Sequence, residues 1–111
     1  MNIVPPTDHG LLQDAMIVHV ESDFEPLMSK FMTNRKKEVV TMREALAQQD
    51  LETVRKVAHG MKGAGGSYGF DHITLMASTI EHTAKSGTSA GLTEELDRLA
   101  FYLEQVHVVF D

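Results

Sequence analysis

The chain of 111 residues contains no cysteine and no tryptophan. The absence of thiols excludes a disulfide framework, a thiolate metal site and a cysteine nucleophile. No window approaches ~18 consecutive apolar residues, the length that a helix needs to cross a bilayer. The first residues, "MNIVPPTDHG", lack the basic region and apolar run of a secretory signal. We therefore expect no membrane association and a cytoplasmic location.

Basic residues are also few, with 10 Lys and Arg against 16 Asp and Glu, which gives a net charge of -6. Nucleic-acid partners require a basic footprint, so we expect no nucleic acid to bind. The six histidines, at positions 9, 19, 59, 72, 82 and 107, include no pair with the i, i+4 spacing that places two imidazoles on one helix face. We therefore predict no metal site.

The first 21 residues differ from the rest of the chain. Pro5, Pro6 and Gly10 interrupt any early helix, and "AMIVHV" at 15–20 is a short β-branched run. No second strand is recognisable elsewhere in the sequence. We predict that residues 1–21 form an extended arm packed on a domain that spans residues 22–111; for residues 1–10 a loosely held terminus is the alternative.

From residue 22 onward, apolar residues recur every three or four positions, as in amphipathic helices. The pattern predicts a first helix from Ser22 or Asp23 that fades at "AQQD" and a second capped by Asp50. It predicts a third capped by Asp71 that stops at "SGTSAG", and a fourth from Ser89 or Thr93 whose apolar face includes Val106 and Phe110. Short connections make neighbouring helices antiparallel. The expected fold is all-α, an antiparallel up-and-down four-helix bundle with an N-terminal extended arm.

The second helix ends in an unusual stretch, "VRKVAHGMKGAGGSYGF" (54–70), with many glycines. Each glycine in a helix interior costs about 1 kcal/mol relative to alanine. Neither the P-loop nor the dinucleotide-binding template fits its spacing. Two interpretations of Gly63 remain open. It leaves a bare surface that another protein can approach closely, together with Gly66, or it permits a tight crossing against a neighbouring helix.

A helical projection separates the two sides of this segment. His59 lies on the polar side, with Arg55 and Lys56 before it and Lys62 after it, opposite the apolar residues Leu51, Val54, Ala58 and Met61. An imidazole is mainly neutral near pH 7, so one ring nitrogen keeps a free lone pair that can attack phosphorus. The neighbouring cations can stabilise the negative charge of a phosphoryl group in transit. The pattern predicts a phosphoryl acceptor and donor.

The stretch "AHGMKGAGGSYGF" resembles the signature of histidine-containing phosphotransfer (HPt) domains, which is His, two residues, Lys-Gly, and a further Gly at the turn. His59, Lys62, Gly63 and Gly69 match this pattern. The resemblance implies a phosphorelay in which a receiver aspartyl-phosphate passes its phosphoryl group to His59 and onward to a second receiver. It implies receiver domains of hybrid sensor kinases and response regulators as partners.

The resemblance also assigns roles to individual residues. It implies His59 and Lys62 as the reacting pair and Gly69 as a structural turn. The cations and bare glycines on the polar side of the helix predict a docking surface made of Arg55, Lys56, Gly60, Gly63, Gly66 and Ser67. No cofactor is expected on this chain, because Mg²⁺ belongs to the receiver in that family, and neither kinase activity nor oligomerisation is expected. The alternative is a non-catalytic helical-bundle adaptor that binds response regulators or other signalling domains; a metal-binding bundle is a third reading.

Overall fold

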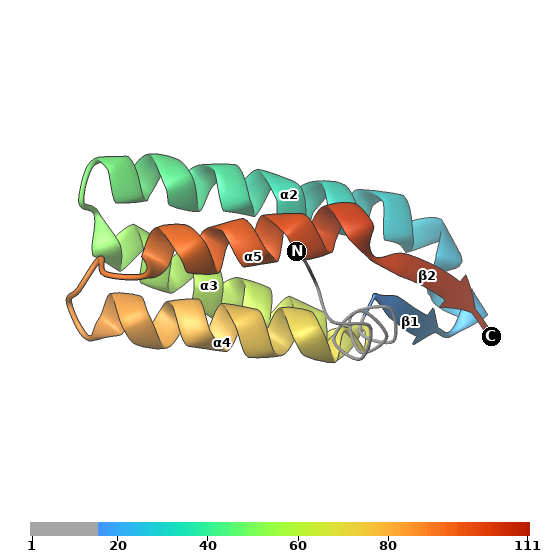
Figure 1. Ribbon diagram of the computed structural model, residues 1–111. Coiled ribbons are helices and arrows are strands. Elements are labelled where there is room, and N and C mark those ends of the chain that lie inside the picture. Colours follow the sequence, from blue (N-terminus) through green and yellow to red (C-terminus); the bar gives the residue numbers. More distant parts are fainter. Residues whose placement is uncertain (1–15) are drawn as a thin grey trace, which may run out of the picture.

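The structure, a computed structural model, describes residues 16–111. Its four helices are α2 (Glu25–Ala47), α3 (Leu51–Ser67), α4 (Asp71–Lys85) and α5 (Leu92–Gln105), with a short 3₁₀ helix η1 (Ser22–Phe24) before α2 and two strands, β1 (Ile17–Val20) and β2 (His107–Phe110). The helices form an elongated bundle with the two strands at one end (Figure 1). The predicted all-α four-helix bundle is confirmed. The predicted arm lies outside the described residues over positions 1–15.

The bundle is held together by one apolar seam on each helix. The inward faces repeat at helical spacing, which buries apolar surface without leaving polar backbone unpaired. α3 and α4 form the tightest pair, and α2 and α5 complete the ring of neighbours. The fully buried side chains at the centre include Met42, Val54, Met61, Phe70, Ile73, Ile80, Leu92, Leu96 and Leu99.

One charged residue, Arg35, interrupts the seam of α2 and is nevertheless buried. Its guanidinium donates two hydrogen bonds to Glu38, at 2.7 and 3.1 Å, and lies 4.7 Å from the centre of the Phe31 ring. The bidentate pair and the aromatic face compensate for removing the charge from water. The polar interruption that the sequence shows near Arg35 therefore does not break the helix.

The last helix is shorter than predicted. α5 ends at Gln105, Val106 is extended, and residues 107–110 form β2, which pairs in parallel with β1 so that Ile17 faces His107 and Val20 faces Phe110. The prediction that the fourth helix continues through Phe110 was wrong, and so was the expectation that the run at 15–20 has no partner strand. The β-branched run "HVVF" favours a strand, but its partner lies at the opposite end of the described chain.

The connection between α3 and α4 is a tight turn at Gly69. This residue adopts φ = +83°, the left-handed conformation that glycine tolerates best. At the start of α3, Asp50 caps the helix as predicted, accepting a hydrogen bond from the Thr53 backbone N–H at 3.1 Å. Asp71 instead lies one residue inside α4, with Phe70 as the N-cap. An acidic residue in the first turn still interacts favourably with the helix dipole.

α3 and α4 lie close together at Gly65, which continues the buried seam of α3. A Cβ built on Gly65 would lie 2.9 Å from Thr74 Oγ1 and 3.0 Å from Ile73 Cγ2. The Thr74 hydroxyl also donates a hydrogen bond to the Lys62 carbonyl at 3.1 Å, which holds the two helices in this register. The glycine that permits a tight helix crossing is therefore Gly65. Gly63 does not have this role, because a Cβ built on it would meet nothing within 4 Å.

Replacing Gly65 by Ala is expected to destabilise the domain by about 1–3 kcal/mol, because the added methyl overpacks the α3–α4 contact. The gain in helix propensity of about 1 kcal/mol offsets only part of this cost. Chemical denaturation of the variant and of the unsubstituted protein measures the difference. An unchanged or raised unfolding midpoint would show that α4 shifts at little energetic cost to accommodate the added methyl group.

Candidate functional site

The candidate site is built on the solvent-facing side of α3. Ala58 and Met61 on either side of His59 are fully buried, so the helix is anchored while the His59 side chain remains 66% exposed. This arrangement follows from the 100° step between successive residues of a helix. The imidazole is therefore held on a rigid element and accessible to another protein.

The orientation of the imidazole is set by a residue from α4. Glu81 approaches His59 so that its Oε2 lies 2.7 Å from the His59 Nδ1. Glu81 is itself only 15% exposed, which limits its freedom to move away. An ionised carboxylate can only accept hydrogen bonds, so in the neutral imidazole Nδ1 must carry the proton. Nε2 then keeps the lone pair, and it has no hydrogen-bond partner among residues 16–111.

The same carboxylate holds Lys62. The Lys62 Nζ donates a hydrogen bond to Glu81 Oε1 at 2.8 Å, so one carboxylate joins the histidine and the lysine of α3. Hydrogen bonds from Lys62 and then from His59 hold the pKa of Glu81 below its ordinary value of 4.5. A folded-state pKa that is lowered contributes stability above the ordinary value, and this contribution is lost as the pH falls through the lowered pKa. The three-residue contact is therefore intact at neutral pH.

The two other predicted basic residues lie one turn before His59. Arg55 makes a bidentate pair with Glu52, at 2.9 and 2.7 Å, and Lys56 lies 3.9 Å from the same carboxylate. The hydrogen bond from Arg55 lowers the pKa of Glu52. The face is thus a mixed network of cations and carboxylates, less basic than the lysines and arginines alone indicate.

The glycines beside the imidazole leave an open surface. A Cβ on Gly60 or Gly63 would meet nothing within 4 Å, and one on Gly66 would make only an ordinary contact with Thr74 at 3.8 Å. Ser67 is exposed and its hydroxyl donates to the Gly63 carbonyl at 3.1 Å. The structure therefore places Gly60, Gly63, Gly66 and Ser67 in solvent, on the same helix as His59.

Sequence reasoning missed Glu81 and the buried Gly65; it considered a helix crossing only at Gly63, as the alternative to the open surface that the structure has there. Gly65 could have been found by extending the α3 seam of Val54, Ala58 and Met61 by one more step of four residues. Glu81 carried no such signal, because its role depends on the register between α3 and α4. His72, which follows the glycines in the sequence, lies away from their surface and packs with its ring 5.9 Å from that of Tyr102 on α5.

Two further features of the described residues concern metal and membrane. Over positions 16–111, no group of three or more histidine, aspartate or glutamate side chains is arranged to hold a metal ion. Within the same range, none of the helices combines the length and the apolar character needed to span a bilayer.

Comparison with known families bears on the site directly. A family model described as the Hpt domain matches residues 26–108, which is most of the chain and includes α3, α4, α5 and all of α2 but its first residue. This chain belongs to the Hpt domain family. The suspected resemblance is thereby confirmed, and membership connects the chain to histidine phosphotransfer in phosphorelays and to receiver domains in general terms. No significant match was found among curated proteins or among solved structures.

Within this Hpt domain, replacing Glu81 by Gln is expected to slow phosphoryl uptake by about 10-fold or more, the size of effect seen when a metal-binding histidine loses the carboxylate that orients it. A glutamine side chain can present either its oxygen or its amide group to Nδ1, so the tautomer with a free Nε2 is no longer enforced. Nitrogen NMR of the imidazole at neutral pH would show a mixture of tautomers.

Glu104→Gln is the matched control, because it makes the same chemical change at a carboxylate of α5 that pairs with Lys36 and not with His59. That variant should keep both the tautomer and the rate of uptake. If the Glu81 variant kept both the imidazole tautomer and the rate of phosphoryl uptake, Glu81 would not contribute to the reaction.

Proposed function

We propose that this Hpt domain is a phosphorelay intermediate in which His59 accepts a phosphoryl group from one receiver aspartate and donates it to another. The observation that carries the proposal is the geometry around the imidazole. Glu81 holds Nδ1 on a rigid helix pair, while Nε2 points its lone pair away from that contact. Such an arrangement presents a nucleophile to a partner without any catalytic base in this chain.

All the bonds that form and break in the transfer step belong to this chain and the receiver. The Nε2 lone pair attacks phosphorus, the new N–P bond forms as the O–P bond of the aspartyl-phosphate breaks, and the receiver carboxylate leaves with the electron pair. The proton on Nδ1 stays on the ring, which gains positive charge, and the Glu81 carboxylate stabilises that charge. The reverse step returns the phosphoryl group to a second receiver. Mg²⁺ on the receiver is expected to neutralise the phosphoryl oxygens.

Lys62 has two functions in this proposal. Its ammonium is paired with Glu81, so it braces the carboxylate that orients His59. It is also one turn from the imidazole and about one-third exposed, which leaves its remaining N–H donors available to a phosphoryl oxygen. We propose Arg55, Lys56 and the exposed glycines as part of the surface to which the receiver domain docks. We also propose that the protein acts in the cytoplasm and as a monomer.

The proposal is tested by incubating the purified protein with a panel of phosphorylated receiver domains. We expect transfer of a phosphate that is stable to base and labile to acid, mapped by mass spectrometry to the peptide that contains His59. The alternative, a non-catalytic adaptor, predicts receiver binding with no covalent phosphate on this chain. Binding without transfer across the whole panel would overturn the proposed function in favour of that alternative.

A further inference from the structure

Arg55 on α3 lies between two carboxylates, one on each side of its guanidinium. Its Nε and Nη2 donate hydrogen bonds to the two oxygens of Glu52, at 2.9 and 2.7 Å. The hydrogen bond to Glu52 is the main cause that raises the pKa of Arg55, and the charge of Glu81 contributes a smaller part. Glu81 in turn contacts the His59 imidazole. The guanidinium is therefore within electrostatic reach of the carboxylate that orients the imidazole.

The spacing of Arg55 and His59 brings their side chains together. Residues four apart lie on the same face of a helix, with their Cβ atoms about 5–6 Å from each other. Helical side chains lean toward the N-terminus, so the imidazole leans over the turn that carries Arg55. The Arg55 Nη1 has no hydrogen-bond partner among residues 16–111. A donor of this guanidinium is thus available beside the imidazole.

Glu52 can separate from Arg55 at little cost. Its carboxylate is 60% exposed, whereas that of Glu81 is 15% exposed and is held by both His59 and Lys62. The Lys56 ammonium lies 3.9 Å from Glu52 and would remain its partner. Glu52 also lies in the first turn of α3, where the helix dipole favours a carboxylate. Since exposed ion pairs contribute little to stability, the pair of Glu52 and Arg55 is the one that can exchange.

Phosphate on His59 would compete with Glu52 for the guanidinium. A phosphoryl group carries up to about two negative charges at neutral pH and has three acceptor oxygens. Arginine binds such oxygens through two parallel N–H donors, in strong charge-assisted hydrogen bonds. We propose that Arg55 exchanges partners when His59 is phosphorylated: its guanidinium leaves Glu52 and binds the phosphoryl oxygens, while Glu52 stays with Lys56. The exchange rests on the proposed function, because it requires phosphate on His59.

The exchange gives the two forms of the domain different surfaces. Without phosphate, Glu52 neutralises Arg55. With phosphate, Arg55 neutralises part of the phosphoryl charge, and the exposed pair becomes Glu52 with Lys56. A receiver that donates the phosphoryl group and a receiver that accepts it therefore meet different charges beside the same imidazole. Glu52 is the residue that sets the balance between the two forms.

The exchange is tested on protein phosphorylated by potassium phosphoramidate, a small donor that needs no receiver. The N–P bond of the reagent breaks, ammonia leaves, and the phosphoryl group joins the imidazole. Mass spectrometry maps the phosphate to His59, and phosphorus NMR at several pH values gives the pKa of the phosphoryl group. We expect this pKa to be higher in Arg55→Gln than in the unsubstituted protein, with a change of about threefold or more in the dissociation constant, because a guanidinium favours the fully charged group.

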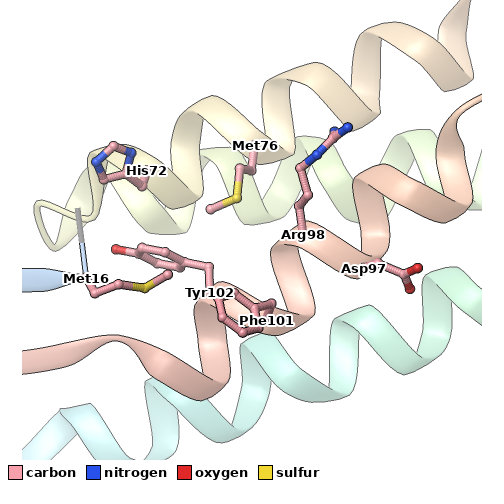
Figure 2. Close-up of a pocket in the computed structure, with 7 residues that line it drawn as sticks. All are labelled: Met16, His72, Met76, Asp97, Arg98, Phe101 and Tyr102. Atoms are coloured by element: carbon pink, nitrogen blue, oxygen red, sulfur yellow. The ribbon is translucent and has the colours of Figure 1, made fainter. Parts of the chain in front are cut away.

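Arg98→Gln is the matched control for the loss of a positive charge. Arg98 is an exposed arginine of α5 that lines a groove of about 610 Å³ between α4 and α5, together with Met76 and Tyr102 (Figure 2). This groove is away from His59 on α3, so the phosphoryl pKa should not change. An equal rise in the Arg55 and Arg98 variants would attribute the effect to net charge and overturn the exchange.

Glu52→Gln tests the release of Arg55 directly. Without this carboxylate the guanidinium is free in advance, so the phosphoryl pKa should fall below that of the unsubstituted protein. The fall should be smaller when Arg55 is already replaced by Gln, because the two residues act as a pair. An equal fall in both backgrounds would mean that Glu52 acts only through its own charge, and would overturn the exchange. Glu94→Gln, the same change in the first turn of α5, should leave the phosphoryl pKa unchanged.

Two results distinguish failure of the exchange from failure of the proposed relay. Phosphate on His59 whose pKa is the same with and without Arg55 would overturn the exchange and leave the relay intact. Absence of phosphate on His59 after treatment with phosphoramidate would show that its Nε2 is not an available nucleophile, which contradicts both.

Discussion

Replacing His59 by Gln is expected to abolish phosphate uptake from phosphorylated receivers while the domain remains folded. The amide nitrogen of glutamine has a delocalised lone pair and is not a nucleophile toward phosphorus, whereas the free Nε2 of the histidine is one. The side chain is 66% exposed, so the substitution should change the free energy of unfolding by no more than ~0.5 kcal/mol. Phosphate transfer and circular dichroism measure the two effects separately.

His82→Gln provides a matched control, because His82 is also a helical histidine and lies next to Glu81 in the sequence. That variant should accept phosphate at the unsubstituted rate. If the His59 variant still acquired a phosphate that is labile to acid and stable to base, a different residue would be the acceptor. Loss of uptake in both variants would instead point to disturbance of α4.

Replacing Gly63 by Ala is expected to stabilise the domain and impair its function. A Cβ at this position meets nothing within 4 Å, so the helix should gain up to about 1 kcal/mol from propensity. The methyl group would protrude one turn from His59, on the surface where we propose that the receiver docks. A displacement of about 1 Å between nucleophile and phosphorus can cost on the order of 100-fold in rate.

Thermal unfolding and single-turnover transfer of the Gly63 variant test both parts. Gly65→Ala is the paired comparison, since the two glycines lie two residues apart and are expected to shift the unfolding midpoint in opposite directions. A raised midpoint with unchanged transfer would show that the receiver does not approach this part of α3. A lowered midpoint would contradict the open surface seen at Gly63.

Some features of the glycine-rich stretch follow from the sequence alone, and others depend on contacts with a second helix. Periodicity alone placed the stretch on the second helix and His59 on its exposed side, because burial of an amphipathic helix is governed by spacing along one chain. It could not decide which glycine serves the fold. Gly65 contacts Ile73 and Thr74, so its role depends on how closely a second helix approaches.

The sequence by itself predicted the four helices, the exposed His59 with Lys62 one turn later, and a resemblance to the family through a motif carried on one helix, which the family match over residues 26–108 confirmed. These features depend on interactions between residues close in sequence. Only the tertiary structure decided the contact of Glu81 with His59, the parallel pairing of β1 with β2, and the groove beside Tyr102. Each of these joins segments that are distant along the chain, and their register is set by packing of the whole bundle, which local periodicity does not encode.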